Sequence, residues 1–339
     1  MLRKSISTLL LLAVIVIFAG AHTAAEATIL RLSHHRPVDS YVHKDAVKFA
    51  EDVKQSTDGR VQFKIYPASQ LGTAEVAFER TSMGALESVI GYPVSEIDPH
   101  LDIYVMPGLA NNFTEVEKVY GHGSPFRKLL DDLFLKQNMY ALFTYMTDFK
   151  GVAFRNIPQN IDNVDAKRPE KIRTPVIDAY RFTAESLGYH GTTLPWSEVF
   201  TGLQTGVIDG AYGAGSEQTC QQLRDVVKCF VPINLQADVY FYLINKDVFD
   251  KLSKEDQALL RNIGIKHEKA RFAQAAADQK YWDDKLRGYG KKVVVISNAD
   301  REVLRKKAMS YAWPKLRKEI GAEFFDKAVE AWKKSINIK

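Results

Sequence analysis

Predicted strands and helices alternate along the chain, and this alternation limits the fold more than any other feature of the sequence. The stretch "ILRLS" has apolar residues on alternate positions, and after the loop "HHRPVDSY" a helix is predicted with Ala46, Phe49, Ala50 and Val53 on one face. The turn "TDGR" leads to a second strand, "VQFKIY", which Pro67 closes. A strand, a helix and a strand at this spacing predict a right-handed parallel unit, and therefore an α/β fold.

The same pattern continues to the end of the chain. A third strand, "SVIGY", follows a helix that Thr73 caps and Gly84 ends. Further strands are predicted at "MYALFTYM", "EKIR" and "VIDGAY", with a helix beginning near Ile177, and "SKED" resembles a capping box that opens a long helix. A chain of 339 residues is long enough for two domains. Because no Gly/Ser linker separates them, we expect the chain to cross between the domains more than once.

The N-terminus predicts export. "MLRK" is basic, "LLLLAVIVIFAGA" is purely apolar, and "AHTAAEA" supplies small residues, which together are typical of a signal peptide over residues 1–27. The apolar run is shorter than the roughly 20 residues of a comfortable membrane span, although an uncleaved anchor is the alternative. We therefore expect a periplasmic protein. The formal net charge is +5 and the basic residues are scattered among acids, which argues against a nucleic-acid partner.

Two cysteines, Cys220 and Cys229, are compatible with one disulfide in an exported protein. On one continuous helix they would lie about 13 Å apart along the axis, too far for a bridge. A bridge therefore requires a turn between them, with Cys220 ending a helix and Cys229 beginning the next strand. The alternative is two buried thiols.

Several polar and aromatic residues follow predicted strands directly. Arg173 ends "EKIR", "HHRP" follows the first strand, and Tyr92 and Tyr212 follow or end two others. Ligands of open parallel sheets bind beyond the carboxyl ends of the strands, so these residues are expected to line one crevice between the domains. The planar guanidinium of Arg173 matches a carboxylate. The alternative is an ion pair of Arg173 with a nearby acid such as Glu170 or Asp178.

Three segments in a fixed order resemble one known family. "VHKDAVKFAEDVKQSTDGRVQFKIYPASQLGTAEVAFERTSMGALE" is similar to the opening of the substrate-binding proteins of tripartite ATP-independent periplasmic (TRAP) transporters, the C4-dicarboxylate and sialic acid receptor family. "KIRTP" followed by "LPWSEVFTGLQTGVIDGA" resembles the second signature, and "YLINKDVFDKLSKEDQALL" resembles the third. The resemblance implies a fold of the periplasmic binding protein type, with two α/β lobes, a ligand cleft between them and a long helix linking the lobes. The approximate boundaries are 28–147 plus 239–277 for lobe I and 148–238 plus 278–339 for lobe II.

The resemblance also implies ligand contacts. Arg173 matches the arginine that clamps the ligand carboxylate, and Trp196 falls where the family places an aromatic wall. The second basic pocket residue corresponds to Lys150 or to Arg155. His35 and Arg36 fall in the first-strand loop that touches ligand, with solvated side chains as the alternative. The remaining residues expected to contact ligand are Tyr92, Tyr212, Gly213, Ser216 and Asp238.

Two departures from the family pattern bear on the ligand. Tyr92 stands where an acidic residue is frequent, and "DGAYGAG" lacks the usual Asn-Pro, so Tyr212 or Ser216 is expected to replace the asparagine hydrogen bond. Without the acidic group an amine-bearing ligand loses its obvious partner, which favours a plain organic acid. Tyr92, Trp196 and Tyr212 would suit a ligand with an apolar or aromatic body, with core positions as the alternative.

The function expected from the resemblance is capture of an organic acid and its delivery to the membrane subunits of a TRAP permease, without catalysis and without a cofactor. A binding protein of an ATP-driven transporter, or a sensory receptor, shares this architecture in outline. An exported hydrolase is disfavoured because "GHGSPF" lacks the G-x-S-x-G elbow. No metal-ligand spacing occurs, since His34 and His35 are adjacent and no H-x-x-x-H helix is present. A monomer is expected, with a dimer as the alternative.

Overall fold

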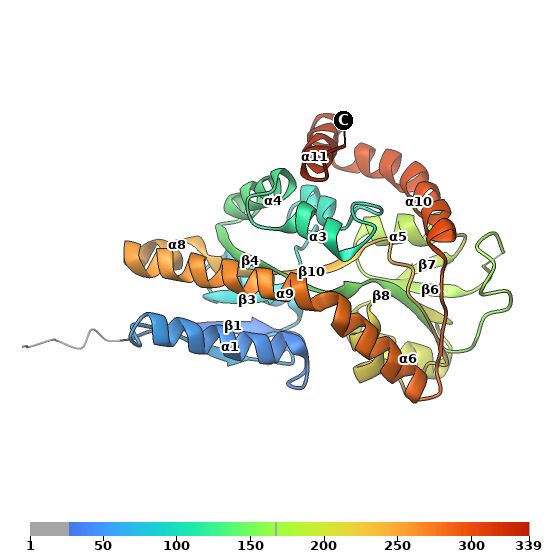
Figure 1. Cartoon of the computed structure of the whole chain (residues 1–339), viewed down its shortest axis with the longest axis horizontal. Coiled ribbons are helices and arrows are strands. Elements are labelled where there is room, and N and C mark those ends of the chain that lie inside the picture. The colour runs from blue at the N-terminus through green and yellow to red at the C-terminus, as the bar shows by residue number, and fades with distance from the viewer. Residues whose placement is uncertain (1–26, 167, 339) are drawn as a thin grey trace, which may run out of the picture.

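The computed structural model describes residues 27–166 and 168–338. The predicted signal peptide therefore lies outside the described residues, apart from its last position, Ala27. Two β-sheets form the centres of two lobes that lie side by side along the longest axis of the molecule (Figure 1). Among the described residues, no helix is both long and apolar enough to cross a membrane.

The first sheet has five strands in the order β2-β1-β3-β10-β4. Its strands are β1 (Thr28–His34), β2 (Val61–Tyr66), β3 (Ser88–Gly91), β4 (Met139–Phe149) and β10 (Ala237–Asn245). The first three are parallel, as the sequence predicts, and β10 runs antiparallel to both of its neighbours. The hairpin-like turn before β2 places Asp58 and Gly59 at positive φ, which explains the "TDGR" signal.

The second sheet has six strands in the order β11-β9-β5-β8-β6-β7. They are β5 (Gly151–Phe154), β6 (Lys171–Thr174), β7 (His190–Thr193), β8 (Gly210–Ala214), β9 (Cys229–Val231) and β11 (Lys292–Val293). The strands β8, β6 and β7 are mutually parallel, so their carboxyl ends meet at one edge of the sheet.

Helices cover both sheets. They are α1 (Tyr41–Ser56), α2 (Ala74–Ser82), the 3₁₀ helix η1 (Pro99–Val105), α3 (Phe113–Tyr120), α4 (Pro125–Lys136), α5 (Asp178–Ser186), α6 (Trp196–Thr205), α7 (Ser216–Gln218), the π-helical turn η2 (Thr219–Leu223), α8 (Lys246–Lys251), α9 (Lys254–Gly288), α10 (Asn298–Glu319) and α11 (Ala322–Ser335). The predicted caps are confirmed: Thr73 accepts from the Val76 amide, and Ser253 accepts from the Asp256 amide. The predicted apolar face of α1 is largely confirmed, with Ala46, Phe49 and Val53 buried.

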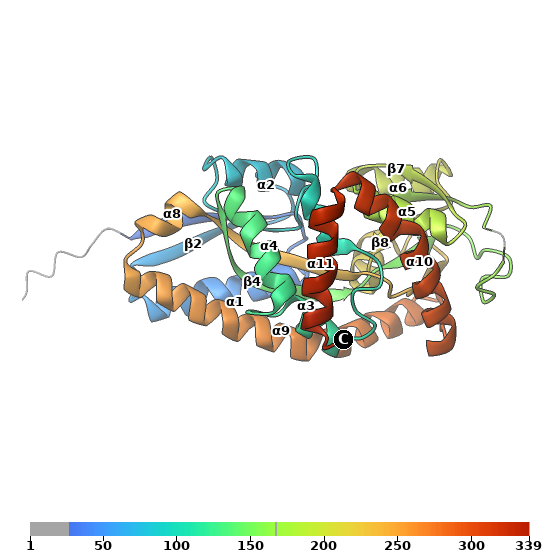
Figure 2. The same ribbon diagram turned by 90° about the horizontal axis from the view of Figure 1, so that it is seen from above.

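The chain crosses between the lobes several times. The strand β4 continues into β5 through a single residue, Lys150, and the segment after β9 returns to β10 in the first sheet. The helix α9 has 35 residues, hence a length of about 52 Å. It packs on α1, α3 and β4 in the first lobe and on α7, η2 and β11 in the second. Figure 2 shows it running along the lower side of both lobes.

The two last helices divide between the lobes. The helix α10 packs on α5 at the second lobe, whereas α11 packs on α4 and α3 at the first, and Figure 2 shows this return across the molecule. The C-terminal segment thus reaches back over the first lobe and adds another connection between the two.

Candidate ligand-binding cleft

A cavity lies between the two sheets, and we call it the cleft cavity. It encloses about 460 Å³, its open mouth included. Its lining is His35, Tyr92, Tyr104, Lys150, Arg173, Pro175, Ile177, Tyr180, Trp196, Gly213, Gln218, Asp238 and Tyr240. Several of these residues follow parallel strands: His35 follows β1, Tyr92 follows β3, and Pro175 follows β6. Strand ends of both lobes therefore face one another across the cavity, as parallel sheets dictate.

Arg173 is the central charged residue of the second lobe's wall. Its Nε donates to the Leu194 carbonyl at 2.7 Å, and Nη1 donates to the Tyr212 carbonyl at 3.3 Å. These two bonds fix the guanidinium between the ends of β7 and β8. The side chain is buried, and within the described residues it forms no ion pair, since Asp178 pairs with Arg181 instead. The pairing of Arg173 with Glu170 or Asp178, considered from the sequence, is absent.

Burial without an acidic partner changes the acidity of this arginine. Desolvation lowers the pKa of Arg173 to about 10, although the residue stays protonated at neutral pH. The ring of Trp196, at the start of α6, lies with its centroid 5.4 Å from the guanidinium carbon. A buried guanidinium with little compensation gains strongly from an anion, so the chemistry of this wall of the cavity suits a carboxylate.

Lys150 and Asp238 form the second charged feature of the cavity. Lys150 Nζ lies 2.5 Å from Asp238 Oδ1, and both side chains are buried. Burial lowers the pKa of Lys150, while the charges of Asp238 and then Asp148 oppose that shift. Lys150 is the crossing residue between β4 and β5, so the pair sits where the two lobes meet.

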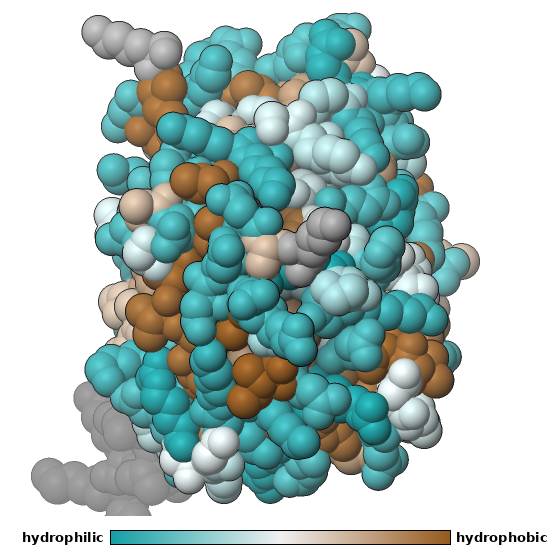
Figure 3. All heavy atoms as spheres, turned by 90° about the vertical axis from the view of Figure 1, so that its right-hand side faces the viewer, coloured by the Kyte–Doolittle hydropathy of each residue, from teal (hydrophilic) through white to brown (hydrophobic). Residues whose placement is uncertain are grey.

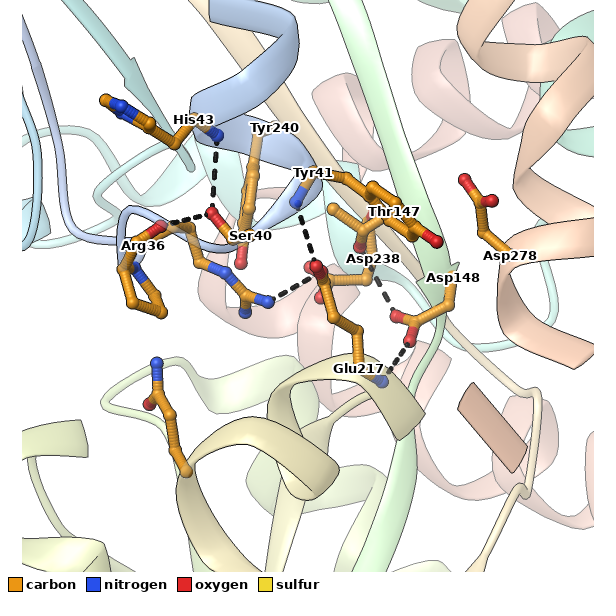
Figure 4. A network of polar contacts seen from close by, with 12 residues as sticks. Arg36, Ser40, Tyr41, His43, Thr147, Asp148, Glu217, Asp238, Tyr240 and Asp278 are labelled. Carbon is orange, nitrogen blue, oxygen red and sulfur yellow. Dashed lines mark hydrogen bonds and ion pairs between the residues drawn. The ribbon is translucent and has the colours of Figure 1, made fainter. Parts of the chain in front are cut away.

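Arg36 follows β1 but forms a different contact from the one predicted. Its Nη2 donates to Glu217 Oε2 at 2.7 Å, and both side chains are almost fully buried. The other oxygen of Glu217 accepts from the Tyr41 amide at 3.0 Å, and the Glu217 amide points at Asp148 Oδ2 (Figure 4). Because Arg36 belongs to the first lobe and Glu217 to α7 of the second, this contact, the interlobe ion pair, joins the lobes across the cleft.

Aromatic side chains form most of the first lobe's wall. The ring of His35 lies edge-on to Tyr92 and Tyr240, with centroids 5.6 and 5.3 Å away. Burial holds the pKa of His35 well below its usual value, so the ring is neutral at physiological pH. The Tyr92 hydroxyl donates to Glu75 Oε1 at 2.5 Å. The loop after β3 thus carries a tyrosine instead of an acidic residue, and the carboxylate that accepts its hydrogen bond comes from α2.

Of the residues expected to contact ligand, the structure brings seven into the lining of the cleft cavity. They are His35, Tyr92, Lys150, Arg173, Trp196, Gly213 and Asp238. Of the two candidates for the second basic residue, Lys150 lies in this lining, whereas Arg155 lies at the far end of β5, against Gly206. Arg36 is taken up by the interlobe ion pair.

Two further expected residues lie behind the wall. Tyr212 is fully buried, with its hydroxyl bonded to the Gln236 side chain, and it reaches the site only through its carbonyl. Ser216 is buried at the start of α7. Tyr212 lies in the core because β8 is a central strand whose two faces are both covered.

The sequence did not single out six residues of the lining: Tyr104, Pro175, Ile177, Tyr180, Gln218 and Tyr240. Tyr240 could have been found, since it follows Asp238 by two positions on β10 and shares its face. Tyr104 could not, because it lies on η1 after a loop without hydrophobic periodicity. Its position depends on packing against β10, where its ring meets Phe241.

The predicted disulfide is absent. Cys220 and Cys229 are both free and buried. As expected, Cys220 lies in a helical turn and Cys229 begins a strand. However, Cys220 packs into the same apolar cluster as Phe230, whereas Cys229 packs into the larger cluster on the opposite face of the sheet. Adjacent residues of a strand point to opposite faces, so Cys229 is directed away from Cys220.

The described residues support neither a hydrolase site at "GHGSPF" nor a metal site. Ser124 of "GHGSPF" caps α4 by accepting from the Arg127 amide, and its hydroxyl donates to the Val119 carbonyl. Its oxygen is therefore occupied in a structural role. Across residues 27–166 and 168–338, no group of three or more His, Cys, Asp or Glu side chains is arranged to hold a metal ion.

A second hollow of about 490 Å³ lies wholly on the second lobe, lined mainly by apolar residues such as Ile161, Leu187 and Val294. The end face of this lobe is largely polar, with apolar side chains in scattered patches (Figure 3). This hollow brings no residues from the two lobes together, so the cleft cavity is the better candidate for a ligand site.

Comparison with known proteins decides the family. Residues 32–319 match the bacterial extracellular solute-binding proteins of family 7. The chain belongs to this family. The resemblance predicted from the three sequence segments is confirmed, and with it the fold of two α/β lobes.

Individual relatives and solved structures are also described as solute-binding proteins. A solute-binding protein of Albidiferax ferrireducens is 26% identical over 310 residues, which cover 88% of each chain. The C4-dicarboxylate-binding periplasmic protein DctP of Rhodobacter capsulatus is 26% identical over 67% of this chain and 68% of its own. Among solved structures, a TRAP periplasmic solute-binding protein of Desulfovibrio salexigens with bound orotic acid superimposes with a TM-score of 0.82 at 22% identity, covering 92% of this chain and 99% of its own. A TRAP periplasmic solute-binding protein of Rhodoferax ferrireducens with bound malonate gives 0.81 at 22% identity, covering 91% and 100%.

Proposed function

We propose that this protein captures an organic acid in the cleft cavity and delivers it to the membrane subunits of a TRAP-type permease. The observation that carries the proposal is Arg173, a buried guanidinium that lines the cavity and forms no ion pair within the described residues. The relatives named as binding C4-dicarboxylate, orotic acid and malonate support a carboxylate as the ligand. The protein acts in the periplasm, as the relatives described as periplasmic do, and performs no chemistry on its ligand.

The proposed ligand contacts are the residues that both the sequence and the cavity indicate. Arg173 binds the carboxylate and Trp196 covers its side. Lys150, Asp238, His35, Tyr92 and Gly213 complete the wall. The proposed lobe boundaries fall near Lys150 and near Asp238, where the chain passes between the sheets, and the protein is proposed to act as a monomer.

A thermal-shift screen tests the ligand class. Purified mature protein is heated with organic acids, neutral sugars and free amines, each well above the expected dissociation constant. A ligand at a hundred times that constant stabilises the folded state by about 2.7 kcal/mol, which raises the melting temperature measurably. Acids are expected to raise it, and sugars and amines to leave it unchanged. A rise with neutral sugars alone would show that the ligand class is wrong.

The permease partner has a separate test. A gene pair encoding a small and a large membrane permease beside the gene for this protein supports the proposal, and a neighbouring transport ATPase gene opposes it. Uptake of the acid by cells that carry the permease pair should depend on the binding protein. Uptake that continues undiminished without the binding protein would refute the partnership.

A further inference from the structure

The side chains that line the cleft cavity carry a net charge of +1. Three charged side chains line it: Arg173, Lys150 and Asp238. Lys150 and Asp238 neutralise each other at 2.5 Å, while Arg173 has no acidic partner within the described residues. His35 is neutral because burial lowers its pKa. A ligand with one negative charge therefore completes the site.

A second negative charge on the ligand finds no free cation among the described residues that line the cavity. Lys150 is already held by Asp238, and the charge of Asp148 also acts on it. Arg36, the next buried cation, is committed to Glu217. A second carboxylate near Lys150 would have to displace Asp238 and leave that buried carboxylate without a partner, which is costly.

Rings and apolar side chains form much of the lining of the cleft cavity. Trp196 and Ile177 stand on the second lobe, and Tyr92 and Tyr240 stand on the first. The indole N–H of Trp196 donates to Gln222 at 2.7 Å, and the Tyr92 hydroxyl donates to Glu75, so these polar atoms are not free for a ligand. A flat ring fits such walls, whereas an open chain with many hydroxyls would lose its water without enough new partners.

Polar groups also line the cleft cavity. The hydroxyls of Tyr104 and Tyr180 and the amide of Gln218 line the cavity, and within the described part of the chain they form no side-chain hydrogen bond. Asp238 lines the same cavity as these residues. Burial raises the pKa of Tyr180 well above its usual value, and Tyr104 and Asp238 add to that shift. The carboxylate of Asp238 favours a hydrogen-bond donor from the ligand.

We propose that the ligand is a monocarboxylate with a flat ring body and a neutral hydrogen-bond donor at its far end, and that Asp238 is the residue that excludes a second carboxylate. This inference rests on the proposed function and narrows it from organic acids in general to one chemical class. Arg173 binds the carboxylate and the rings pack against the body of the ligand. Asp238 and Tyr180 contact the hydrogen-bond donor.

Calorimetric titration of the mature protein with a matched set of acids tests the class. The probes are 4-hydroxybenzoate, benzoate, terephthalate and gluconate, together with 4-hydroxyphenylacetate as a longer ring monoacid. We expect one of the hydroxylated ring monoacids to bind best. Benzoate, which lacks the donor, terephthalate, which adds a carboxylate, and gluconate, an open polyhydroxy acid, should each bind at least tenfold more weakly.

Two variants test the assignment of the far end. Asp238→Asn should improve binding of terephthalate relative to the best monoacid by tenfold or more, because Lys150 is then free to bind the second carboxylate. Tyr180→Phe should reduce the preference for the hydroxylated acid over benzoate, and it serves as the test if Asp238→Asn does not fold. The control is Glu198→Gln, which alters an exposed acid on α6 and should leave every ratio unchanged.

The outcomes separate this inference from the proposed function. If terephthalate, gluconate or any other dicarboxylate or open-chain acid binds best, the ring monoacid class is wrong, while the organic-acid function stands. If no acid binds in the titrations or in the wider screen, both are overturned. If Asp238→Asn folds and leaves the terephthalate ratio as in the wild type, Asp238 does not set the selectivity.

Discussion

Two buried arginines lie at the cleft, and they differ in their partners. Arg36 is 1% exposed and pairs with Glu217 of the opposite lobe, so its pKa is raised by that charge despite its burial. Arg173 is 5% exposed, donates to two carbonyls, and has no ion-pair partner in the described part of the chain, and its burial lowers its pKa to about 10. A buried arginine whose charge is met within the protein holds the lobes together. A buried arginine whose charge is not met there is suited to a charged ligand.

The largest expected effect comes from removing the partner of Arg36. Glu217→Ala leaves a buried guanidinium without its counter-charge, which should destabilise the closed arrangement of the lobes by about 3 to 5 kcal/mol. Opening of the cleft relieves this cost by admitting water. We therefore expect weaker ligand binding by calorimetry and a larger radius of gyration by small-angle scattering.

A charge-free replacement of the pair provides the control for this variant. In Arg36→Met combined with Glu217→Leu, neither charge is left buried alone, so much of the lost affinity should return. Glu198→Ala, an exposed acid of the same lobe, should behave as the wild type. If Glu217→Ala binds ligand and closes as the wild type does, the pair does not join the lobes in solution.

The next effect is on Arg173. Arg173→Ala should weaken binding of the best acid by about 2 to 5 kcal/mol, because the ligand carboxylate loses the cavity cation that has no ion-pair partner among the described residues. Arg173→Lys keeps the charge but loses the planar fork, so it should restore only part of the affinity. The melting temperature of the ligand-free protein should fall by a smaller amount, since two hydrogen bonds to carbonyls are lost. Calorimetric titrations that give equal affinities for the three proteins would end the clamp assignment.

Asp148 makes the surroundings of Arg36 sensitive to pH. Burial, followed by the charges of Asp238 and Glu217, raises the pKa of Asp148 to about 7, against the favourable charges of Lys150 and Arg36. The folded protein therefore binds this proton more tightly than the unfolded chain does, and stability from this group falls as the pH rises from about 4 to about 7.

Replacing Asp148 with asparagine should remove that loss. Denaturant unfolding of Asp148→Asn and wild type, at about pH 5 and about pH 8, should show the variant gaining at the higher pH, by on the order of 3 kcal/mol or less. The amide still offers an oxygen to the Glu217 N–H. A variant that is destabilised equally at both values would mean that the carboxylate is ionised and needed throughout the range.

The smallest effect is expected at the cysteines. Burial raises the pKa of Cys229 to about 11 and also raises that of Cys220, so both thiols react slowly in the folded protein. Thiol counting under denaturing, non-reducing conditions should give two thiols, and a reductant should leave the melting temperature unchanged. A count of zero thiols, with loss of stability on reduction, would show that Cys220 and Cys229 form a disulfide although they pack on opposite faces of the second sheet.

The fold and the position of Arg173 in the cleft could be predicted from the sequence because both depend on local patterns. Strand alternation, the "SKED" cap and the Arg-Thr-Pro strand end are each readable within a few residues. The role of Arg36 is not readable in this way, since its partner Glu217 is 181 positions away and no pattern links them. The cysteines fail for a related reason. Spacing fixes how far apart two residues can lie, but which face of β9 carries Cys229 depends on how the strand enters its sheet.

The helix α9 changes direction where it passes from the first lobe to the second (Figure 1), and it packs on elements of both. Any rotation between the lobes must therefore alter the curvature of a continuous helix about 52 Å long. Long helices curve gently, whereas a sharp kink requires a specific cause such as a proline or a π-bulge. We therefore expect the angle between the lobes of the ligand-free protein to depend partly on the bending of α9, although no residue of α9 lines the cleft cavity.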